Sequence, residues 1–309
     1  MVAPGAFALL ALTPGGDLSR FQYTEVHMGM QARIVVYAPD EPRARRAASA
    51  AFSRIGAVDA ALSDYRRDSE LMRLCDHAGE GPVKVSADLF RVLSRAQELA
   101  KWSDGAFDVT CGPVVALWRQ ARRTGRLPSD ADRQAALKLV GWRNVVLHPS
   151  RREVELKMPG MRLDMGGIAK GYACDAAMKE IRWYGLRRAM VEMGGDLVVG
   201  DPPPGKAGWA IEMPNVEDPV DRVQYLSNVA VSTSGDTEQF VEIGGKRYSH
   251  IVDPRTGMGL TSRVAVTVIA RKGEVSDGLS TALSVLGEDA ERELARRFGA
   301  LSVYIRRAD

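Results

Sequence analysis

The segment VAVTVIARKGEVSDGLSTALSVLG, residues 264–287, contains the clearest change of hydrophobic period in the chain. Its first seven residues are apolar or β-branched, which predicts a buried strand. After the turn residues Arg-Lys-Gly, apolar side chains recur at helical spacing and predict a helix over about residues 276–286. A strand that leads into a helix in this way favours a body in which sheets and helices pack on each other.

The same two periods alternate along the rest of the chain. Apolar residues at helical spacing predict further helices over residues 42–62, from Ser86 to just before Gly105, and over 129–139, 168–184 and about 288–298. Short β-branched or alternating stretches predict strands at residues 144–148, 153–157, 189–193, 209–213, 229–233 and 300–307. The predicted fold class is α+β (mixed α/β), with mixed sheets and flanking helices.

Length and composition exclude several classes of protein. The 309 residues include 45% hydrophobic and 26% charged residues, as in ordinary globular proteins. The formal net charge of +3 gives no electrostatic case for nucleic acid as a partner, so none is expected. No apolar run approaches the roughly 20 residues that a transmembrane span needs. The three cysteines lie far apart and form no Cys-x-x-Cys pair, which favours free thiols.

The amino terminus, MVAPGAFALLALTPGG, has an apolar stretch of signal-peptide length but no Lys or Arg before it. We therefore interpret residues 1–20 as a remnant signal or a disordered tail, and residues 21–309 as a single domain. A periplasmic or envelope-associated location is expected, with the cytoplasm as the alternative.

The stretch RLDMGGIAKGYACDAA, residues 162–177, passes through Gly166-Gly167 into a helix. Glycines allow a ligand to approach the backbone, and a helix N-terminus offers unpaired N–H groups and a positive dipole end. These features together suit a phosphate. The alternative is a tight turn that uses glycine for packing, with Lys170 pointing either to a phosphate or to water.

The helix predicted in the opening segment carries Asp277 and Thr281 four residues apart, so both lie on one face near its start. A carboxylate and a hydroxyl form an all-oxygen set that suits a hard cation such as Mg²⁺. Alternatively, Asp277 caps the helix and Thr281 bonds back to the preceding turn.

Two acidic corners allow more than one interpretation. In GAFDVTCGPVVALW, residues 105–118, Asp108 either contacts a ring amide or ribose hydroxyl of a ligand, or caps the following turn. In VEMGGD, residues 191–196, Asp196 is predicted to bond its own backbone in a turn.

The loop YSHIVDPRTGMG, residues 248–259, follows a hairpin-like run with a Gly244-Gly245 turn. It crowds His250, Asp253 and Arg255 against two glycines, and such a loop is costly to order. We therefore expect it to serve a polar ligand, with Arg255 either steering a phosphate or pairing with a carboxylate.

Taken together and in this order, the polar motifs resemble those of the ApbE family of flavin transferases. The segments that carry the resemblance run from Met28-Gly29 to about Gly287. They are MGM, SDYRRDSELMRL, GAFDVT, LDMGGIAKGYACD, VEMGGD, VSTSGD, YSHIVDPRTG and SDGLSTAL. The resemblance implies an ApbE-like fold with an FAD cleft between two lobes.

The resemblance also implies an activity. Proteins of this family bind FAD with Mg²⁺, cleave its pyrophosphate, attach FMN through a phosphoester to a Thr or Ser of an acceptor protein, and release AMP. The implied acceptors are redox-pump subunits or extracytoplasmic flavoproteins. The alternatives are an FAD pyrophosphatase that gives FMN and AMP, or a non-catalytic protein that binds or stores FAD.

Site roles follow from the resemblance residue by residue. His250 matches the catalytic histidine, which would take the proton of the incoming hydroxyl. Asp277 and Thr281 match the metal ligands, together with a main-chain carbonyl around Gly167. The residues that match FAD contacts are Met28, Tyr65, Ala106, Phe107, Asp108, Asp164, Lys170 and Ile251.

Overall fold

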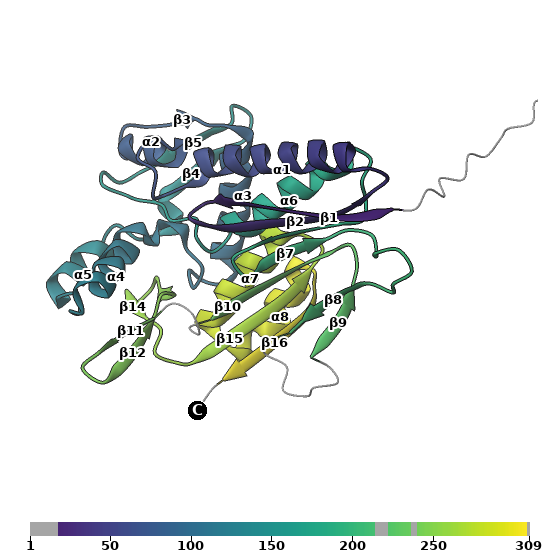
Figure 1. The fold of residues 1–309 in the computed structure, drawn as a ribbon. Helices are drawn as coiled ribbons and strands as arrows, with labels where there is room; N and C mark the ends of the chain where they lie inside the picture. The colour runs from purple at the N-terminus through teal and green to yellow at the C-terminus, as the bar shows by residue number, and fades with distance from the viewer. Residues whose placement is uncertain (1–17, 214–221, 236–239, 308–309) are drawn as a thin grey trace, which may run out of the picture.

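The computed structural model describes residues 18–213, 222–235 and 240–307 (Figure 1). The signal or tail predicted at residues 1–20 therefore lies almost wholly outside the described residues, as does Asp236 at the end of VSTSGD. The first described strand starts at Ser19, just before the predicted domain boundary.

A seven-stranded sheet forms the centre of the molecule, in the order β1-β2-β6-β7-β10-β15-β16. All of its neighbouring strands are antiparallel. The strands are β1 (Ser19–His27), β2 (Met30–Ala38), β6 (Ala189–Met193), β7 (Asp196–Val199), β10 (Val229–Gly235), β15 (Val264–Ala270) and β16 (Ala300–Arg307).

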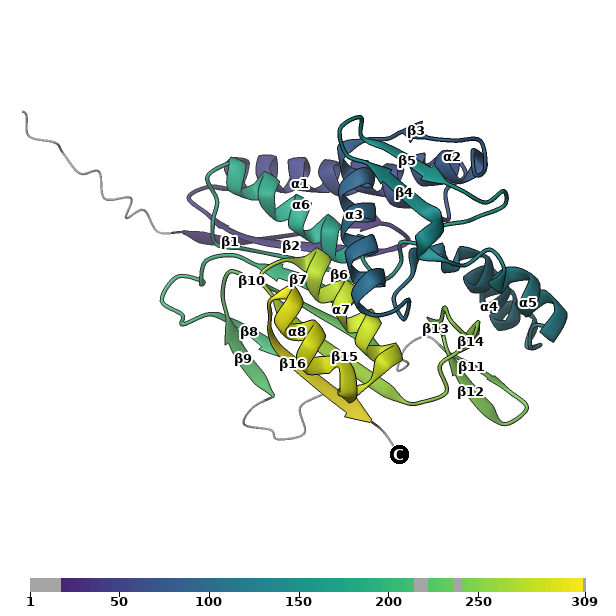
Figure 2. The ribbon, with the colours of Figure 1, turned by 180° about the vertical axis from the view of Figure 1, so that it is seen from behind.

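Helices cover one face of this sheet, as Figures 1 and 2 show. Helices α1, α6, α7 and α8 contact the strands directly, and α3 packs on α1 and α7. Buried side chains of these helices and strands form the largest hydrophobic core. The helices are α1 (Glu41–Leu62), α3 (Ala87–Trp102), α6 (Ala169–Trp183), α7 (Gly273–Leu286) and α8 (Glu291–Phe298).

The opposite face carries a smaller core that includes Val35, Val231 and Trp209. Trp209 belongs to the hairpin of β8 (Trp209–Glu212) and β9 (Val223–Leu226), which lies beside this face (Figure 1).

A peripheral unit completes the fold. It joins α4 (Gly112–Thr124) and α5 (Asp130–Leu137) to two hairpins, β11–β12 and β13–β14, around a third core that contains Trp118 and Tyr248 (Figures 1 and 2). The hairpin strands are β11 (Phe240–Ile243), β12 (Lys246–Ser249), β13 (Val252–Asp253) and β14 (Met258–Gly259).

The remaining short elements connect these parts. A three-stranded sheet and α2 lie beside α1 and α3 (Figure 2). They are α2 (Glu70–Asp76), β3 (Val83–Lys84), β4 (Val145–His148), β5 (Glu153–Leu156), and the 3₁₀ turns η1 (Val109–Cys111), η2 (Trp142–Asn144) and η3 (Glu288–Ala290).

The predicted α+β class is confirmed, and most predicted helices and strands lie within a few residues of those observed. The predicted start of α7 is wrong, because the helix begins at Gly273 rather than near Ser276. Asp175 of α6 explains this early start, since its carboxylate accepts from Gly273 N at 2.9 Å and Glu274 N at 3.1 Å. A cap supplied by another helix leaves no signal in the sequence next to α7.

Two further observations bear on the sequence predictions. All three cysteines are free, with Cys75 and Cys174 buried. Among the residues that the structure describes, no helix combines the length and the apolar character needed to cross a membrane.

Candidate functional site

The two helices singled out from the sequence meet at their N-terminal ends. Backbone contacts backbone there, since a Cβ built on Gly171 of α6 would lie 2.1 Å from the carbonyl oxygen of Gly273 of α7. Only glycine allows this approach, because any larger residue at Gly171 would collide with the facing helix. The contact brings Lys170 of α6 next to Asp277 of α7.

Three charged side chains meet at this junction. Lys170 Nζ is 2.6 Å from Asp196 Oδ2 and 3.3 Å from Asp277 Oδ1, and both carboxylates are almost completely buried. Gly171 N donates to the other oxygen of Asp277 at 3.0 Å. Lys170 therefore points neither to bulk water nor to its own helix, and Asp196 pairs with it instead of simply bonding its own backbone as predicted.

The charge count at the junction is unbalanced, because two carboxylates share one ammonium group. Burial, followed by repulsion from Asp196, raises the pKa of Asp277 to about 7. Burial lowers the pKa of Lys170, but the two carboxylates outweigh this effect and hold the pKa above its ordinary value. A second cation near Asp277 would therefore be stabilised electrostatically.

Thr281 lies one helical turn after Asp277 and faces the glycine turn before α6. A Cβ built on Gly167 would lie 3.0 Å from Thr281 Oγ1 and 3.2 Å from the ring of Phe107. Ser234 Oγ of β10 lies 3.3 Å from Thr281 Oγ1. The structure thus brings together the three predicted metal-ligand positions, Gly167, Asp277 and Thr281.

The alternative interpretation of the α7 motif does not hold. Asp277 lies in the second turn of α7 and does not cap its own helix, because Asp175 supplies that cap. Its carboxylate bonds Gly171 N in the first turn of α6 instead. The side chains that bond back to the preceding turn of this helix are serines, Ser276, Ser280 and Ser284.

The donor set at this junction fits a small hard cation. The candidates are a carboxylate, a hydroxyl and a main-chain carbonyl, all of them oxygen ligands of the kind Mg²⁺ prefers. Ile168, the N-cap residue of α6, offers no side-chain cap, and Asp277 of α7 accepts from Gly171 N in the first turn instead. The positive dipole end of α6 therefore faces the same place. Within residues 18–213, 222–235 and 240–307, no cluster of three or more His, Cys, Asp or Glu suggests a different metal centre.

A second polar group lies just before the glycine turn. Asp164 Oδ1 accepts from Gly166 N at 2.8 Å, and its Oδ2 accepts from Arg119 of α4 at 2.8 Å. Arg119 also pairs with Asp64 and lies over the ring of Tyr65, with 4.1 Å from the guanidinium carbon to the ring centroid. Two predicted flavin contacts, Tyr65 and Asp164, are therefore linked through one arginine.

The Asp108 carboxylate serves the local backbone. Oδ1 accepts from Thr110 N and Thr110 Oγ1, at 2.8 and 2.7 Å, and Oδ2 accepts from Trp142 N at 2.8 Å. Burial raises its pKa despite these bonds. The capping alternative therefore describes the side chain, while a flavin contact by Ala106, Phe107 or Asp108 stays a prediction.

Met28 forms the β1–β2 turn with Gly29, and both residues have positive φ, 51° and 73°. Met30, one residue further, packs against Gly194 in the VEMGGD corner, beside the Lys170 side chain. The first and fifth of the quoted motifs thus meet beside Lys170 of the fourth, at the edge of the candidate site.

His250 and Ile251 belong to the peripheral unit. Ser249 Oγ accepts from Ile251 N at 3.0 Å, and Trp118 Nε1 of α4 donates to the Gly257 carbonyl at 2.9 Å. Arg255 donates to both oxygens of Asp253. It therefore pairs with a carboxylate, which is one of the two alternatives expected from the sequence. The loop is thereby fixed against α4, but the reach of His250 to a ligand at α7 stays a prediction.

Several polar residues of the site escaped the sequence interpretation. Asp64 lies within one of the quoted motifs and Asp175 within another, yet neither was given a role. Arg119 follows Trp118, one residue beyond the quoted segment 105–118, and no role was expected for it. The helix that carries Arg119 could have been predicted from Pro113, which stands in the first turn of α4, a position that suits proline.

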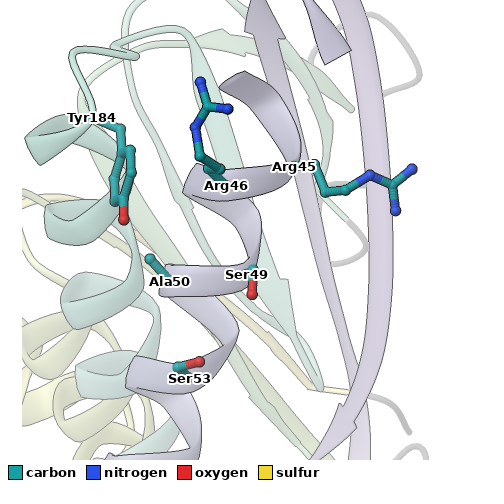
Figure 3. A pocket seen from close by; sticks show the side chains of 6 residues that line it. All are labelled: Arg45, Arg46, Ser49, Ala50, Ser53 and Tyr184. Atoms are coloured by element: carbon teal, nitrogen blue, oxygen red, sulfur yellow. The ribbon is translucent and has the colours of Figure 1, made fainter. Parts of the chain in front are cut away.

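Two surface grooves of the protein lie away from the candidate site. One groove is lined by Arg45, Arg46, Ser49, Ala50 and Ser53 of α1 and by Tyr184, where Arg45 points away from Tyr184 (Figure 3). Another lies between α4 and α5. Neither groove is lined by a predicted site residue, so the candidate site rests on its polar contacts rather than on cavity size.

A buried acid, a hydroxyl and a glycine turn at two facing helix openings define a candidate site for a phosphate-bearing ligand and a hard cation. Comparison with known proteins narrows this class. Residues 28–305 match the ApbE family, and the chain belongs to that family.

Individual relatives agree with this assignment. An FAD:protein FMN transferase of Haemophilus influenzae is 37% identical over 262 residues, which are 80% of this chain and 74% of that protein. The crystal structure of the ApbE protein from Thermotoga maritima superposes with a TM-score of 0.81 at 31% identity, covering 94% of this chain and 97% of that one. The apo form of the Pseudomonas stutzeri flavinyl transferase ApbE gives 0.80 at 31% identity, covering 93% and 90%.

Proposed function

We propose that this protein is a Mg²⁺-dependent FAD:protein FMN transferase. It would cleave the diphosphate of FAD, attach FMN to a Thr or Ser hydroxyl of an acceptor protein, and release AMP. The observation that carries the proposal is the meeting of Asp277 and Thr281 with Gly167 at the openings of α6 and α7. Relatives named FAD:protein FMN transferase support the same function.

Asp277, Thr281 and the Gly167 carbonyl would hold the metal, which when bound supplies positive charge to the diphosphate. The N-terminal end of α6 would face the same phosphates with its positive dipole end. Lys170 would stay salt-bridged to Asp196 and keep a fixed positive charge beside them.

His250 would act as the general base. Its imidazole would take the proton as the acceptor oxygen attacks the FMN phosphorus, and the bond from that phosphorus to the AMP oxygen would break. AMP then leaves with the electron pair of that bond. The loop that carries His250 is held by Trp118 and by the Asp253–Arg255 pair, which would keep the base in place.

The transfer assay uses the purified chain, FAD and Mg²⁺, with and without an acceptor domain that presents a Thr. The expected result is an acceptor whose intact mass grows by one FMN phosphoester, together with free AMP. His250→Ala is expected to abolish the adduct, whereas His77→Ala, on the exposed end of α2, serves as the matched control and keeps it.

Each other outcome selects a different function. Free FMN and AMP without an adduct would indicate an FAD pyrophosphatase, in which water replaces the acceptor hydroxyl. Unchanged FAD in both reactions would indicate a protein that only binds or stores FAD. A normal rate of FMN transfer by His250→Ala would contradict its role as the base.

We also propose that the protein works at the cell envelope on a redox-pump subunit or an extracytoplasmic flavoprotein. The apolar residues 6–12 near the amino terminus support this location, since such a stretch is typical of export signals. Fractionation of cells that produce the full chain tests the proposal. Recovery of the protein in the cytoplasm alone would contradict it.

A further inference from the structure

Arg119 joins parts of the site that lie far apart in the sequence. We propose that Arg119 is a positioning residue, which holds the Tyr65 ring and the Asp164 carboxylate in the arrangement that receives the flavin nucleotide. This inference deepens the proposed function and rests on FAD being the ligand. Arg119 is not among the residues that the sequence motifs predict to contact FAD or the metal.

The contacts of Arg119 are directed and specific. One guanidinium nitrogen lies 2.5 Å from Asp64 Oδ2 and another 2.8 Å from Asp164 Oδ2, and only about a quarter of the side chain is exposed. The remaining nitrogen, Nε, is buried without a hydrogen-bond partner in the described part of the chain. An unpaired buried donor costs stability, so packing alone does not explain an arginine here.

The Tyr65 ring is available for a ligand. The guanidinium lies over the ring at 4.1 Å from its centroid, yet 73% of the residue is exposed. A tyrosine this exposed is free to change rotamer unless something fixes it, and the cation–π contact with Arg119 does so. A ring fixed on one face offers the other for stacking on a planar heterocycle.

The Asp164 carboxylate is fixed in the same way. It bridges Arg119 and Gly166 N, the residue directly before Gly167. Asp64 and Asp164 are both largely buried and would repel each other without the guanidinium between them. Arg119 thus fixes the direction of the Asp164 carboxylate and, through Gly166, supports the turn at the start of α6.

Helix α4 extends this support to the other side of the site. Trp118, the neighbour of Arg119, donates to Gly257 in the loop that contains His250. Two consecutive residues of one helix therefore contact the Asp164 segment and the His250 loop. Any shift of α4 would move both, which is why the matched control for Arg119 belongs on the same helix.

The test measures FAD affinity from the quenching of flavin fluorescence, without Mg²⁺ or acceptor, in the full chain and its variants. Arg119→Met is expected to weaken FAD binding about tenfold, because Tyr65 and Asp164 both lose their support. Arg119→Lys is expected to recover part of this loss, since lysine keeps the charge but cannot bridge two carboxylates. Arg123→Met, an exposed residue of α4, is expected to bind FAD normally.

Two further readouts separate positioning from a purely structural role. In the transfer assay, Arg119→Met is expected to raise KM for FAD about tenfold and to leave kcat within about twofold. Combined with Tyr65→Ala, it is expected to cost less than the sum of the two single changes. If Arg119→Met does not fold, the double variant Asp64→Asn with Arg119→Met is measured in its place. Removing the Asp64 carboxylate restores the net charge that the loss of the guanidinium changed.

Normal FAD affinity in a folded Arg119→Met protein, or full additivity with Tyr65→Ala, would overturn the inference. A wild-type chain that binds FAD but transfers nothing would overturn the proposed function and leave the role of Arg119 standing. A wild-type chain that does not bind FAD would overturn both.

Discussion

At the scale of single residues, the junction of Lys170, Asp196 and Asp277 combines a stability cost with a chemical use. Two buried carboxylates face one ammonium group, and the raised pKa of Asp277 reflects the cost of ionising it there. Proteins keep such groups mainly at functional sites. A bound cation would remove the imbalance.

The substitution Asp277→Asn tests both the stability cost and the chemical use of this carboxylate. We expect FMN transfer to fall by about 100-fold or more, because Asp277 is the only carboxylate among the proposed metal ligands. In metal-free protein at pH 7.5 we expect the free energy of unfolding to rise by about 1 kcal/mol, because Lys170 keeps Asp196 and no unbalanced charge stays buried. Assayed rates and urea denaturation check both. Unchanged transfer, or a marked loss of stability, would contradict this interpretation.

At the scale of elements, the glycine contact between α6 and α7 sets how closely the two openings approach. Gly171→Ala places a Cβ against the Gly273 carbonyl, so the helices must separate. We expect a loss of about 1–3 kcal/mol in unfolding free energy together with weaker FAD binding.

Gly56→Ala on α1 is the matched control, because a Cβ there meets nothing closer than 3.8 Å. In the middle of a helix this change is expected to stabilise the protein by up to about 1 kcal/mol. Equal melting temperatures for Gly171→Ala and wild type would show that the contact does not constrain the helices.

Asp175 gives the same junction a pH dependence. Burial raises the pKa of this carboxyl to about 6, although two backbone N–H groups of α7 oppose the shift. A carboxyl whose pKa is raised on folding binds protons more tightly in the folded state, so its contribution to stability is present at low pH and is lost as the pH rises towards and through 6.

Asp175→Asn keeps a cap on α7 but cannot titrate. The difference in unfolding free energy, wild type minus variant, is therefore expected to fall by about 2 kcal/mol between pH 4.5 and pH 7.5. Urea denaturation at several pH values measures it. A difference that does not change with pH would mean that Asp175 titrates alike in the folded and unfolded chain.

At the scale of the whole molecule, local sequence patterns predicted most helices and strands but not how these elements pack together. Helix α1 and strand β15 were expected because their periods are strong and their apolar faces are buried. The order of the central sheet left no local trace, since pairs such as β2 with β6 depend on long-range packing. The hairpin of β1 and β2 was missed, because its turn is Met28-Gly29 and Met28 is an uncommon residue at positive φ.

The residues of the candidate site also differ in whether a local pattern or a long-range contact reveals them. Asp277 and Thr281 could be named as candidates because they lie next to a strand-to-helix turn with its own composition, whereas the metal role expected for Gly167 came only from the family resemblance. Arg119 and the cap from Asp175 act across the fold, so only the assembled structure places them. The sequence also left the partner of Lys170 open, and the structure supplies it in Asp196.

The central claim is that Asp277, Thr281 and Gly167 hold a divalent cation against the phosphates of FAD. Its most direct test is a crystal structure of the protein with FAD and Mn²⁺, in which the anomalous signal locates the metal. We expect a peak within bonding distance of the Asp277 carboxylate, Thr281 Oγ1 and the Gly167 carbonyl. A peak elsewhere, or bound FAD with no metal at α7, would contradict it.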